Sequence, residues 1–313
     1  MKFGIQHPNF TYDGQGAQII DTLTTLARTA EQLGFDSFWV MDHFYQIEFV
    51  GKPEEPMLEG WTTISVLAGL TSKIKLGTMV TGNIYRNPAI LAKIGATLDV
   101  LSKGRLILGI GAGWNKQESR GYGVPFPPTR ERLERLEEAV QVIKKMWTEE
   151  RATFNGKYYK IESALCNPKP IQKPHPKIVI GGSGEKLLLR TVAKYGDACN
   201  LFGSPETVKR KLGILREHCK AVGRDYDSIL KTKLTRVMIG EDGEMIKNIV
   251  DGMSKSMPPG MLKEFMLYGT PEEVRQQVAE FSDVGIEYMD TSYGGPNELA
   301  SLKLFGEKVL PVF

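Results

Sequence analysis

Short apolar runs alternate with amphipathic stretches along most of the chain. Runs rich in β-branched, aliphatic or aromatic residues predict strands over residues 2–7, 37–41, 74–78, 105–111, 177–181, 197–201, 231–239 and 286–291. Apolar residues that recur every three or four positions predict helices over 18–33, 61–70, 88–101, 129–146, 185–194, 205–222, 271–283 and 297–309, and helices within 244–267. The chain therefore consists of about eight strand–helix units.

This alternation predicts an α/β fold in which one parallel sheet closes into a (β/α)₈ TIM barrel, a single domain spanning residues 1–313. Surplus residues form insertions after strands 2 and 4, at about 46–60 and 113–128. A third insertion precedes strand 5, at 152–176, where an Asn-Gly hairpin signal is followed by a proline-rich connector. The alternative for the same pattern is a doubly wound open sheet.

Composition narrows the class of protein. The 313 residues are 41% hydrophobic and 25% charged, and the net charge of +3 is too small to indicate a nucleic-acid partner. The three cysteines form no disulfide or zinc pattern, and no metal-binding motif occurs. The sequence has no long apolar segment, so we expect a cytoplasmic protein that does not bind membranes, acts on a small molecule and holds no metal.

Candidate chemistry is expected where barrel strands end, because the loops at the carboxyl ends of the strands build the active site in this fold. The pair Asp42-His43 follows the second strand, and histidine is the side chain most easily poised for proton transfer near neutral pH. His7 ends the first strand and is a second candidate. His175 and His218 fall in a connector and a helix, so we expect both to be solvated.

Glycines also cluster at strand ends. Residues 181–184 (GGSG) precede a predicted helix and are a candidate phosphate cradle, with a flexible turn as the alternative. Gly109, Gly111 and Gly113 resemble part of a dinucleotide fingerprint, but the final glycine is missing, so we reject a Rossmann fold. We expect these glycines to let a flat ring approach the barrel mouth. No motif for acyl or phosphoryl transfer occurs, which favours an organic cofactor.

Four segments, taken together and in order, resemble the bacterial luciferase-like flavin and deazaflavin oxidoreductases, and most closely the branch that uses coenzyme F420. They are residues 33–44 (LGFDSFWVMDHF), 76–91 (LGTMVTGNIYRNPAIL), 98–114 (LDVLSKGRLILGIGAGW) and 178–184 (IVIGGSG). The resemblance covers nearly the whole chain. It implies a (β/α)₈ barrel with long insertions and a tricyclic ring in its mouth.

The resemblance also implies roles for particular residues. Met79 and Val80 would back the ring, with a non-prolyl cis peptide between them, and Thr81 and Gly82 would lie along its polar edge. Asp42 would bind the deazaflavin and His43 would lie near the reacting carbon as the catalytic group. The remaining cofactor-binding residues implied are Gly111, Ala112, Gly113 and Asn115 on the fourth strand's side, and Gly181, Gly182 and Ser183 at the phosphate.

One departure concerns the substrate pocket, in which we place His7, Trp114 and Glu118. Sugar-phosphate dehydrogenases of this family have a glutamate acid where this chain has Trp114, which disfavours a sugar-phosphate substrate. Glu118 could replace that acid if its loop is helical. We instead favour a solvated loop carboxylate at Glu118, and a Trp114 that walls the pocket or stacks near the ring.

The function expected from these residues is an F420-dependent oxidoreductase that moves a hydride between deazaflavin C5 and a small organic substrate, with His43 shuttling a proton. One alternative is a reduced-FMN monooxygenase that uses oxygen. A second is a non-catalytic flavin- or deazaflavin-binding protein, since fold does not guarantee function. The resemblance also implies a homodimer.

Overall fold

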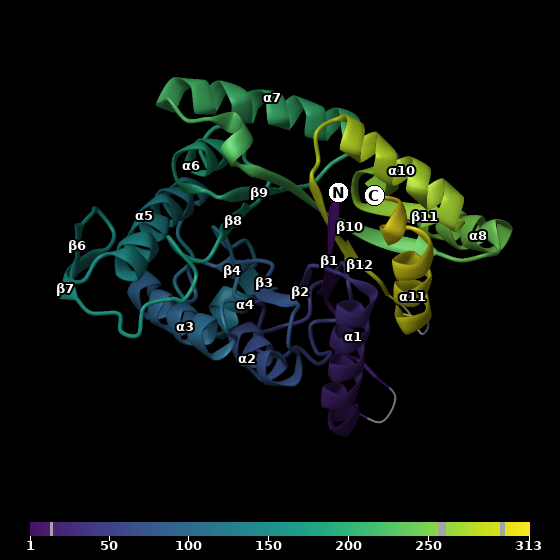
Figure 1. Ribbon diagram of the computed structural model, residues 1–313, viewed down its shortest axis with the longest axis horizontal. Coiled ribbons are helices and arrows are strands. Elements are labelled where there is room, and N and C mark those ends of the chain that lie inside the picture. The colour runs from purple at the N-terminus through teal and green to yellow at the C-terminus, as the bar shows by residue number, and fades with distance from the viewer. Residues whose placement is uncertain (13–14, 256–260, 295–297) are drawn as a thin grey trace.

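A computed structural model describes residues 1–12, 15–255, 261–294 and 298–313. Its parallel strands are β1 (Lys2–His7), β2 (Ser37–Val40), β3 (Lys75–Thr78), β4 (Thr81–Gly82), β5 (Leu108–Gly111), β8 (Ile178–Gly181), β9 (Ala198–Leu201), β10 (Leu230–Ile239), β11 (Met266–Gly269) and β12 (Tyr288–Ser292). Figure 1 shows the barrel strands at the centre of the molecule with helices around them, and β11 to one side, beside α8 (Gly243–Ser254) and α10 (Pro271–Asp283).

The sheet order β3-β2-β1-β12-β10-β9-β8-β5-β4 closes on itself. β3 and β4 are two parts of one wall strand, of which the first pairs with β2 and the second with β5. A parallel bridge between Leu76 and Leu106 joins β3 to the segment before β5. The predicted (β/α)₈ barrel is therefore confirmed, and the open doubly wound sheet is excluded.

Helices follow the wall strands as their spacing predicts. They are α1 (Ile19–Leu33), α2 (Gly60–Leu70), α3 (Pro88–Leu101), α4 (Lys116–Gly121), α5 (Thr129–Thr148), α6 (Leu188–Tyr195), α7 (Pro205–Val222), α8 (Gly243–Ser254), α9 (Met261–Phe265), α10 (Pro271–Asp283) and α11 (Glu298–Lys308). Short 3₁₀ turns occur at η1 (Gln15–Gln18), η2 (Tyr226–Ser228) and η3 (Leu310–Val312). α3 begins at a proline, where a missing N–H costs no intrahelical bond.

The predicted hairpin is also present, as β6 (Ala152–Asn155) and β7 (Lys160–Ala164), an antiparallel pair at the edge of the molecule beside α5 (Figure 1). Two differences from the predicted elements affect the site. α6 begins at Leu188 and not at 185, because residues 185–187 form a turn. The predicted helical range 244–267 also ends too late: Met266 and Leu267 belong to β11 (Met266–Gly269), which pairs with the end of β10. The predicted start of the last helix, Asn297, lies outside the described residues.

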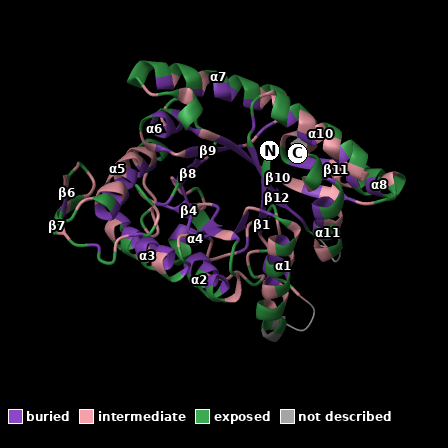
Figure 2. Ribbon diagram, viewed as in Figure 1, coloured by how far each residue is buried: buried purple, intermediate pink, exposed green. Residues whose placement is uncertain are grey.

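Side chains of the wall strands alternate between two environments, since successive residues of a strand point to opposite faces. Outward residues such as Phe3, Ile5 and Phe38 join the large apolar cluster between barrel and helices. Inward residues form a separate small cluster of Trp39, Met79, Ile107, Val179 and Ala198. Figure 2 shows the buried strands at the centre, enclosed by helices that are exposed on their outer faces. This alternation decides which strand-end residues reach the mouth.

Candidate functional site

His43 lies just beyond the end of β2 and is held by a buried carboxylate. Its Nδ1 lies 2.8 Å from Oε2 of Glu118, whose other oxygen accepts the backbone N–H of Phe44 at 2.9 Å. The His43 side chain is 12% exposed and the Glu118 side chain 0%. A carboxylate at Nδ1 orients the ring and assigns the proton of the neutral imidazole to that nitrogen, which leaves Nε2 able to exchange a proton.

Glu118 owes this place to the short helix α4. The Asn115 side chain caps the helix by accepting the backbone N–H of Glu118 at 3.1 Å. In this first helical turn the Glu118 side chain contacts His43. Our expectation of a solvated loop carboxylate was therefore wrong, because the segment is helical and Glu118 is buried. The signal was present in the sequence, since Asn followed three residues later by Glu is typical of a helix start.

Trp114 lies over the same histidine. Its indole is 55% exposed and meets the His43 ring edge-on, with 5.4 Å between ring centroids. Phe44, Tyr85 and Tyr122 form an aromatic group beside it, with Phe44 4.9 Å from Tyr85 and 4.6 Å from Tyr122 between centroids. An exposed tryptophan against the proton-carrying ring is suited to contact an organic substrate.

The side chain of Asp42, the residue before His43, is fully buried and paired with an arginine. Its two oxygens accept hydrogen bonds from the guanidinium of Arg86 at 2.6 and 2.9 Å, and Arg86 also pairs with Glu59, which caps α2. Burial opposes the charge of Arg86, yet the two carboxylates hold its pKa above the usual value. Asp42 therefore anchors the strand end, and its expected roles in catalysis and cofactor binding stay predictions.

The segment between β3 and β4 contains a cis peptide bond at Met79–Val80, which confirms the expectation for this bond. Met79 belongs to the inner cluster and Val80 packs against it. A Cβ placed on Gly111 or Gly181 would lie 2.9 Å from a Val80 methyl group, and one on Gly109 would lie 2.1 Å from the Thr78 carbonyl oxygen.

These contacts correct our interpretation of the glycines. The space cleared at Gly109, Gly111 and Gly181 is filled by the chain's own Val80 and Thr78, so the glycines do not open the mouth directly. They let the segment that contains the cis peptide lie flat across the strand ends. Val80 itself remains partly exposed and presents an apolar floor to the mouth.

At the other predicted cofactor-binding residues, backbone groups and not side chains are available to a cofactor. Thr81 is fully buried, and its hydroxyl bonds to Trp61 Nε1 at 3.0 Å and to the Thr78 hydroxyl at 2.6 Å. The place of a Cβ on Gly82 is taken by the ring of Tyr85. Ala112 packs against the outer core, Asn115 caps α4, and Gly113 has φ +77°, which favours glycine.

The glycine loop after β8 has the properties of an anion cradle. Gly182 has φ +145°, and Ser183 and Gly184 are exposed. Within the described part of the chain, the backbone N–H groups of Ser183 and Gly184 donate to no backbone or side-chain acceptor. Free, outward N–H groups fit a phosphate. Because α6 starts only at Leu188, this loop and not the helix end would hold it.

His7 is not part of the mouth. Its side chain points outward from the barrel, as those of Phe3 and Ile5 do, and is fully buried. Both ring nitrogens are hydrogen-bonded, Nδ1 to Glu298 at 2.9 Å and Nε2 to the Tyr12 hydroxyl at 2.6 Å. Burial, and then Glu298, raise the pKa of Tyr12, so the phenol stays protonated. Our placement of His7 in the substrate pocket was wrong because strand alternation turns it toward the helices.

The two remaining histidines are less exposed than expected. His175 has a side chain only 10% exposed and bonds through Nδ1 to the Pro176 carbonyl oxygen at 2.8 Å. His218 is partly buried and bonds through Nε2 to the Glu185 carbonyl oxygen at 2.9 Å. Both are structural. Among the residues with described placement, no group of three or more potential ligands is arranged to hold a metal ion.

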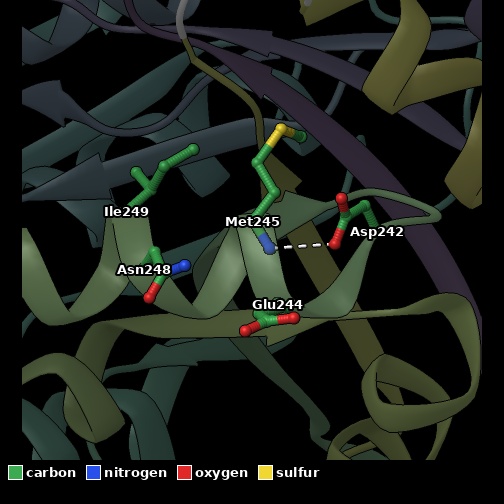
Figure 3. Close-up of a pocket in the computed structure, with 5 residues that line it drawn as sticks. All are labelled: Asp242, Glu244, Met245, Asn248 and Ile249. Carbon is green, nitrogen blue, oxygen red and sulfur yellow. Dashed lines mark hydrogen bonds between the residues drawn. The ribbon is translucent and has the colours of Figure 1, made fainter.

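A surface pocket of about 510 Å³ lies away from His43, on α8. Figure 3 shows its lining, in which Asp242 Oδ1 accepts the backbone N–H of Met245 at 2.9 Å as the helix cap. Glu244, Asn248 and Ile249 complete it. Asp242 is committed to the helix cap and none of the lining residues contacts His43, so the strand-end cluster around His43 remains the candidate active site.

Comparison with known proteins agrees with this geometry. Residues 1–248 match the family described as luciferase-like monooxygenase. The chain is 31% identical, over 93% of its length and 92% of the relative's, to an F420-dependent glucose-6-phosphate dehydrogenase of Kineococcus radiotolerans. It is 28% identical, over 83% of its length and 84% of the relative's, to a phthiodiolone/phenolphthiodiolone dimycocerosates ketoreductase of Mycobacterium bovis.

Solved structures show the same fold. An F420-dependent secondary alcohol dehydrogenase in complex with an F420-acetone adduct superposes with a TM-score of 0.82 at 23% identity, covering 99% of this chain and 98% of that one. A long-chain alkane monooxygenase gives a TM-score of 0.82 at 17% identity, covering 99% and 90%. No helix in the described ranges is long and apolar enough to cross a membrane.

Proposed function

Because the chain belongs to the luciferase-like monooxygenase family, we propose that it is an oxidoreductase that uses the deazaflavin coenzyme F420 to oxidise or reduce a small organic substrate. The observation that carries the proposal is the imidazole of His43, which buried Glu118 holds at a barrel strand end and whose Nε2 has no partner among the described residues. The curated relatives that resemble the chain over most of its length include F420-dependent dehydrogenases, which supports the choice of cofactor.

The residues at the mouth fit this cofactor. The unpaired N–H groups of Ser183 and Gly184 would hold its phosphate, and the partly exposed Val80 would support its ring. Backbone groups at Thr81 and Gly82 remain to meet the ring's polar edge, since the Thr81 side chain is engaged elsewhere. When bound, F420 supplies or accepts a hydride at C5 of its ring.

His43 performs the accompanying proton transfer. With Nδ1 held by Glu118, Nε2 takes a proton from a substrate hydroxyl during oxidation or returns it during reduction. Buried Glu118 stabilises the imidazolium that forms, because the positive charge arises 2.8 Å from a carboxylate oxygen. Trp114 shields this transfer from one side and contacts the substrate.

The arrangement favours alcohols and ketones as the reacting groups. A single imidazole that exchanges one proton while one hydride moves is sufficient for a secondary alcohol and its ketone. Trp114 stands where family sugar-phosphate dehydrogenases have an acid, and Glu118 is bonded to His43, so His43 is the proton-transfer group that these residues provide. We therefore propose an alcohol or ketone substrate, in a pocket that has a tryptophan in place of the acid of the sugar-phosphate dehydrogenases.

The test is a fluorescence titration of the purified protein with oxidised F420 and, separately, with FMN. We expect saturable F420 binding and much weaker FMN binding. Tight FMN binding without F420 binding would reject the proposal and favour a reduced-FMN monooxygenase. A binder of F420 that turns over no alcohol or ketone in a broad screen would support a non-catalytic protein.

We further propose that the protein is a cytoplasmic homodimer. Ile20 and Val66, 43% and 46% exposed, line an apolar groove between α1 and α2, as is typical of subunit interfaces. Sedimentation at micromolar concentration tests this assembly. We expect a dimer for the native chain and a larger monomer fraction for the Val66→Arg variant. A native monomer would reject the dimer.

A further inference from the structure

Arg236 is a cationic side chain on the inner face of the barrel that no described residue neutralises by contact. It lies on β10 two residues beyond Leu234, which packs against the inner cluster, so strand alternation places Arg236 on the same inward face, nearer the carboxyl end. Among described residues, none forms an ion pair with its guanidinium or accepts a hydrogen bond from it.

The surroundings of Arg236 form one polar layer. Strand register aligns Arg236 with Ser292 on β12. Gln6 of β1 belongs to the same layer, because Gly4 aligns with Asp290 and Gln6 lies two residues further along, as Ser292 does. Gln6 and Ser292 are 4% and 9% exposed. Three adjacent strands thus carry a guanidinium, a hydroxyl and an amide at equivalent depth.

The loop after β12 leaves room for the guanidinium. A Cβ on Gly294 would lie 2.4 Å from Nη2 of Arg236, so a larger residue there would displace it. Burial lowers the pKa of Arg236 and the charge of Glu298 partly offsets this. Oε1 of Glu298 is bonded to His7, and the carboxylate forms no ion pair with Arg236 in the described structure.

The other wall of the barrel is apolar. Met79, Ile107, Val179 and Ala198 face inward from β3 through β9 and pack against Trp39. A ring that rests on Val80 would lie over this apolar wall, which leaves the β10–β12–β1 wall for the substrate. An uncompensated guanidinium in a partly buried mouth favours a ligand oxyanion, to which arginine donates two parallel hydrogen bonds.

We propose that Arg236, together with Ser292 and Gln6, binds an anionic group of the substrate, a carboxylate or a phosphate, on the wall opposite the cofactor ring. The proposal rests on the proposed function, since it assigns the second end of the same substrate. It makes the substrate an alcohol or ketone that carries an acidic group at some distance from the reacting carbon. The competing explanation is that Arg236 only offsets the charge of Glu298.

The test measures binding of inorganic phosphate and of acetate to the F420-loaded protein by calorimetry. In that state the loop at Ser183 would hold the cofactor's own phosphate. We expect the native protein to bind at least one anion and Arg236→Gln to bind it about tenfold or more weakly. Arg190→Gln is the matched control, because Arg190 is exposed and pairs with Glu137, and it should bind as the native protein does.

Three further measurements, of F420 affinity, circular dichroism and KM, distinguish the loss of an anion site from a collapse of the mouth. Arg236→Gln should retain native F420 affinity and circular dichroism, which shows that the mouth has not collapsed. It should raise KM about tenfold for an acidic substrate and leave KM unchanged for the matching neutral ester. Equal anion affinity in the native and Arg236→Gln proteins, or no anion binding by the native protein, overturns the inference.

Failure of the proposed function would look different. If F420 does not bind the native protein, the same titrations run on the protein without cofactor, and the difference between native and Arg236→Gln still reports the Arg236 site. Phosphate bound at the glycine loop would then appear equally in both proteins.

Discussion

The molecule contains two histidine–glutamate pairs of nearly equal length in very different settings. His43 and Glu118 are 2.8 Å apart, and His7 and Glu298 are 2.9 Å apart. His43 is 12% exposed and has one ring nitrogen free, whereas His7 is fully buried with its second nitrogen on Tyr12. A carboxylate partner therefore does not by itself distinguish a catalytic histidine. We expect the catalytic histidine to be the one whose second ring nitrogen has no partner among the described residues.

Removal of His43 should have the largest effect on turnover. His43→Ala deletes the group that exchanges the proton, and general acid–base catalysis contributes about 10²–10⁴-fold. We expect kcat to fall within that range while the Kd for F420 stays within a few fold. Steady-state assays and fluorescence titration measure the two. Undiminished kcat would move proton transfer to another group.

Removal of His7 should instead affect stability. His7→Ala opens a cavity and leaves the partly buried Glu298 and Tyr12 without their shared partner, which costs about 2–4 kcal/mol of unfolding free energy. Urea unfolding measures this loss, and kcat per folded molecule should remain within about threefold of native, a tolerance well below the loss expected for a general acid–base. A large fall in kcat with native stability would assign His7 a role at the mouth.

Glu118→Gln tests whether the carboxylate orients the His43 ring and stabilises its protonated form. Glutamine has one acceptor oxygen, so it can accept from Phe44 N–H or from Nδ1–H of His43 but not from both, and it removes the negative charge beside His43. We therefore expect kcat to fall roughly 10–100-fold. Steady-state assays measure this fall, and fluorescence titration should give a Kd for F420 within a few fold of the native value. Glu298→Gln is the comparison, and its kcat should match the native one. An undiminished kcat in Glu118→Gln would make Glu118 purely structural.

Trp114→Ala should have the smallest effect. The indole is 55% exposed and contacts His43 only at its edge. We expect KM to rise less than about tenfold with a smaller change in kcat, since the lost interaction is mainly binding. Trp114→Phe should recover most of the native KM. A kcat loss as large as that of His43→Ala would place Trp114 in the chemistry.

Much of the fold follows from local sequence pattern. The alternation of apolar runs and helical spacing predicts the barrel, and the resemblance at residues 76–91 predicts the cis bond at Met79–Val80. β11 was missed because Met266–Gly269 is short and adjoins a helix, so its pattern is that of a helix end. The pairing with β10 that defines it is a long-range contact.

The site was only partly predictable for the same reason. Strand-end position identified His43, but the choice between His43 and His7 depends on strand phase, which Phe3 and Ile5 already indicated. Arg86 and Arg236 were missed, because an arginine is common on any surface and its partners lie far away in sequence. That Val80 fills the space at Gly111 and Gly181 also depends on three separate strands.

The comparison of the two histidines is tested most directly by single-turnover hydride transfer in F420-loaded protein. The absorbance of the bound deazaflavin is followed after mixing with the best alcohol or ketone substrate. We predict that His43→Ala slows this step by at least about a hundredfold, whereas His7→Ala, assayed below its unfolding range, matches the native rate. Equal slowing of both variants, or of His7→Ala alone, would contradict the account.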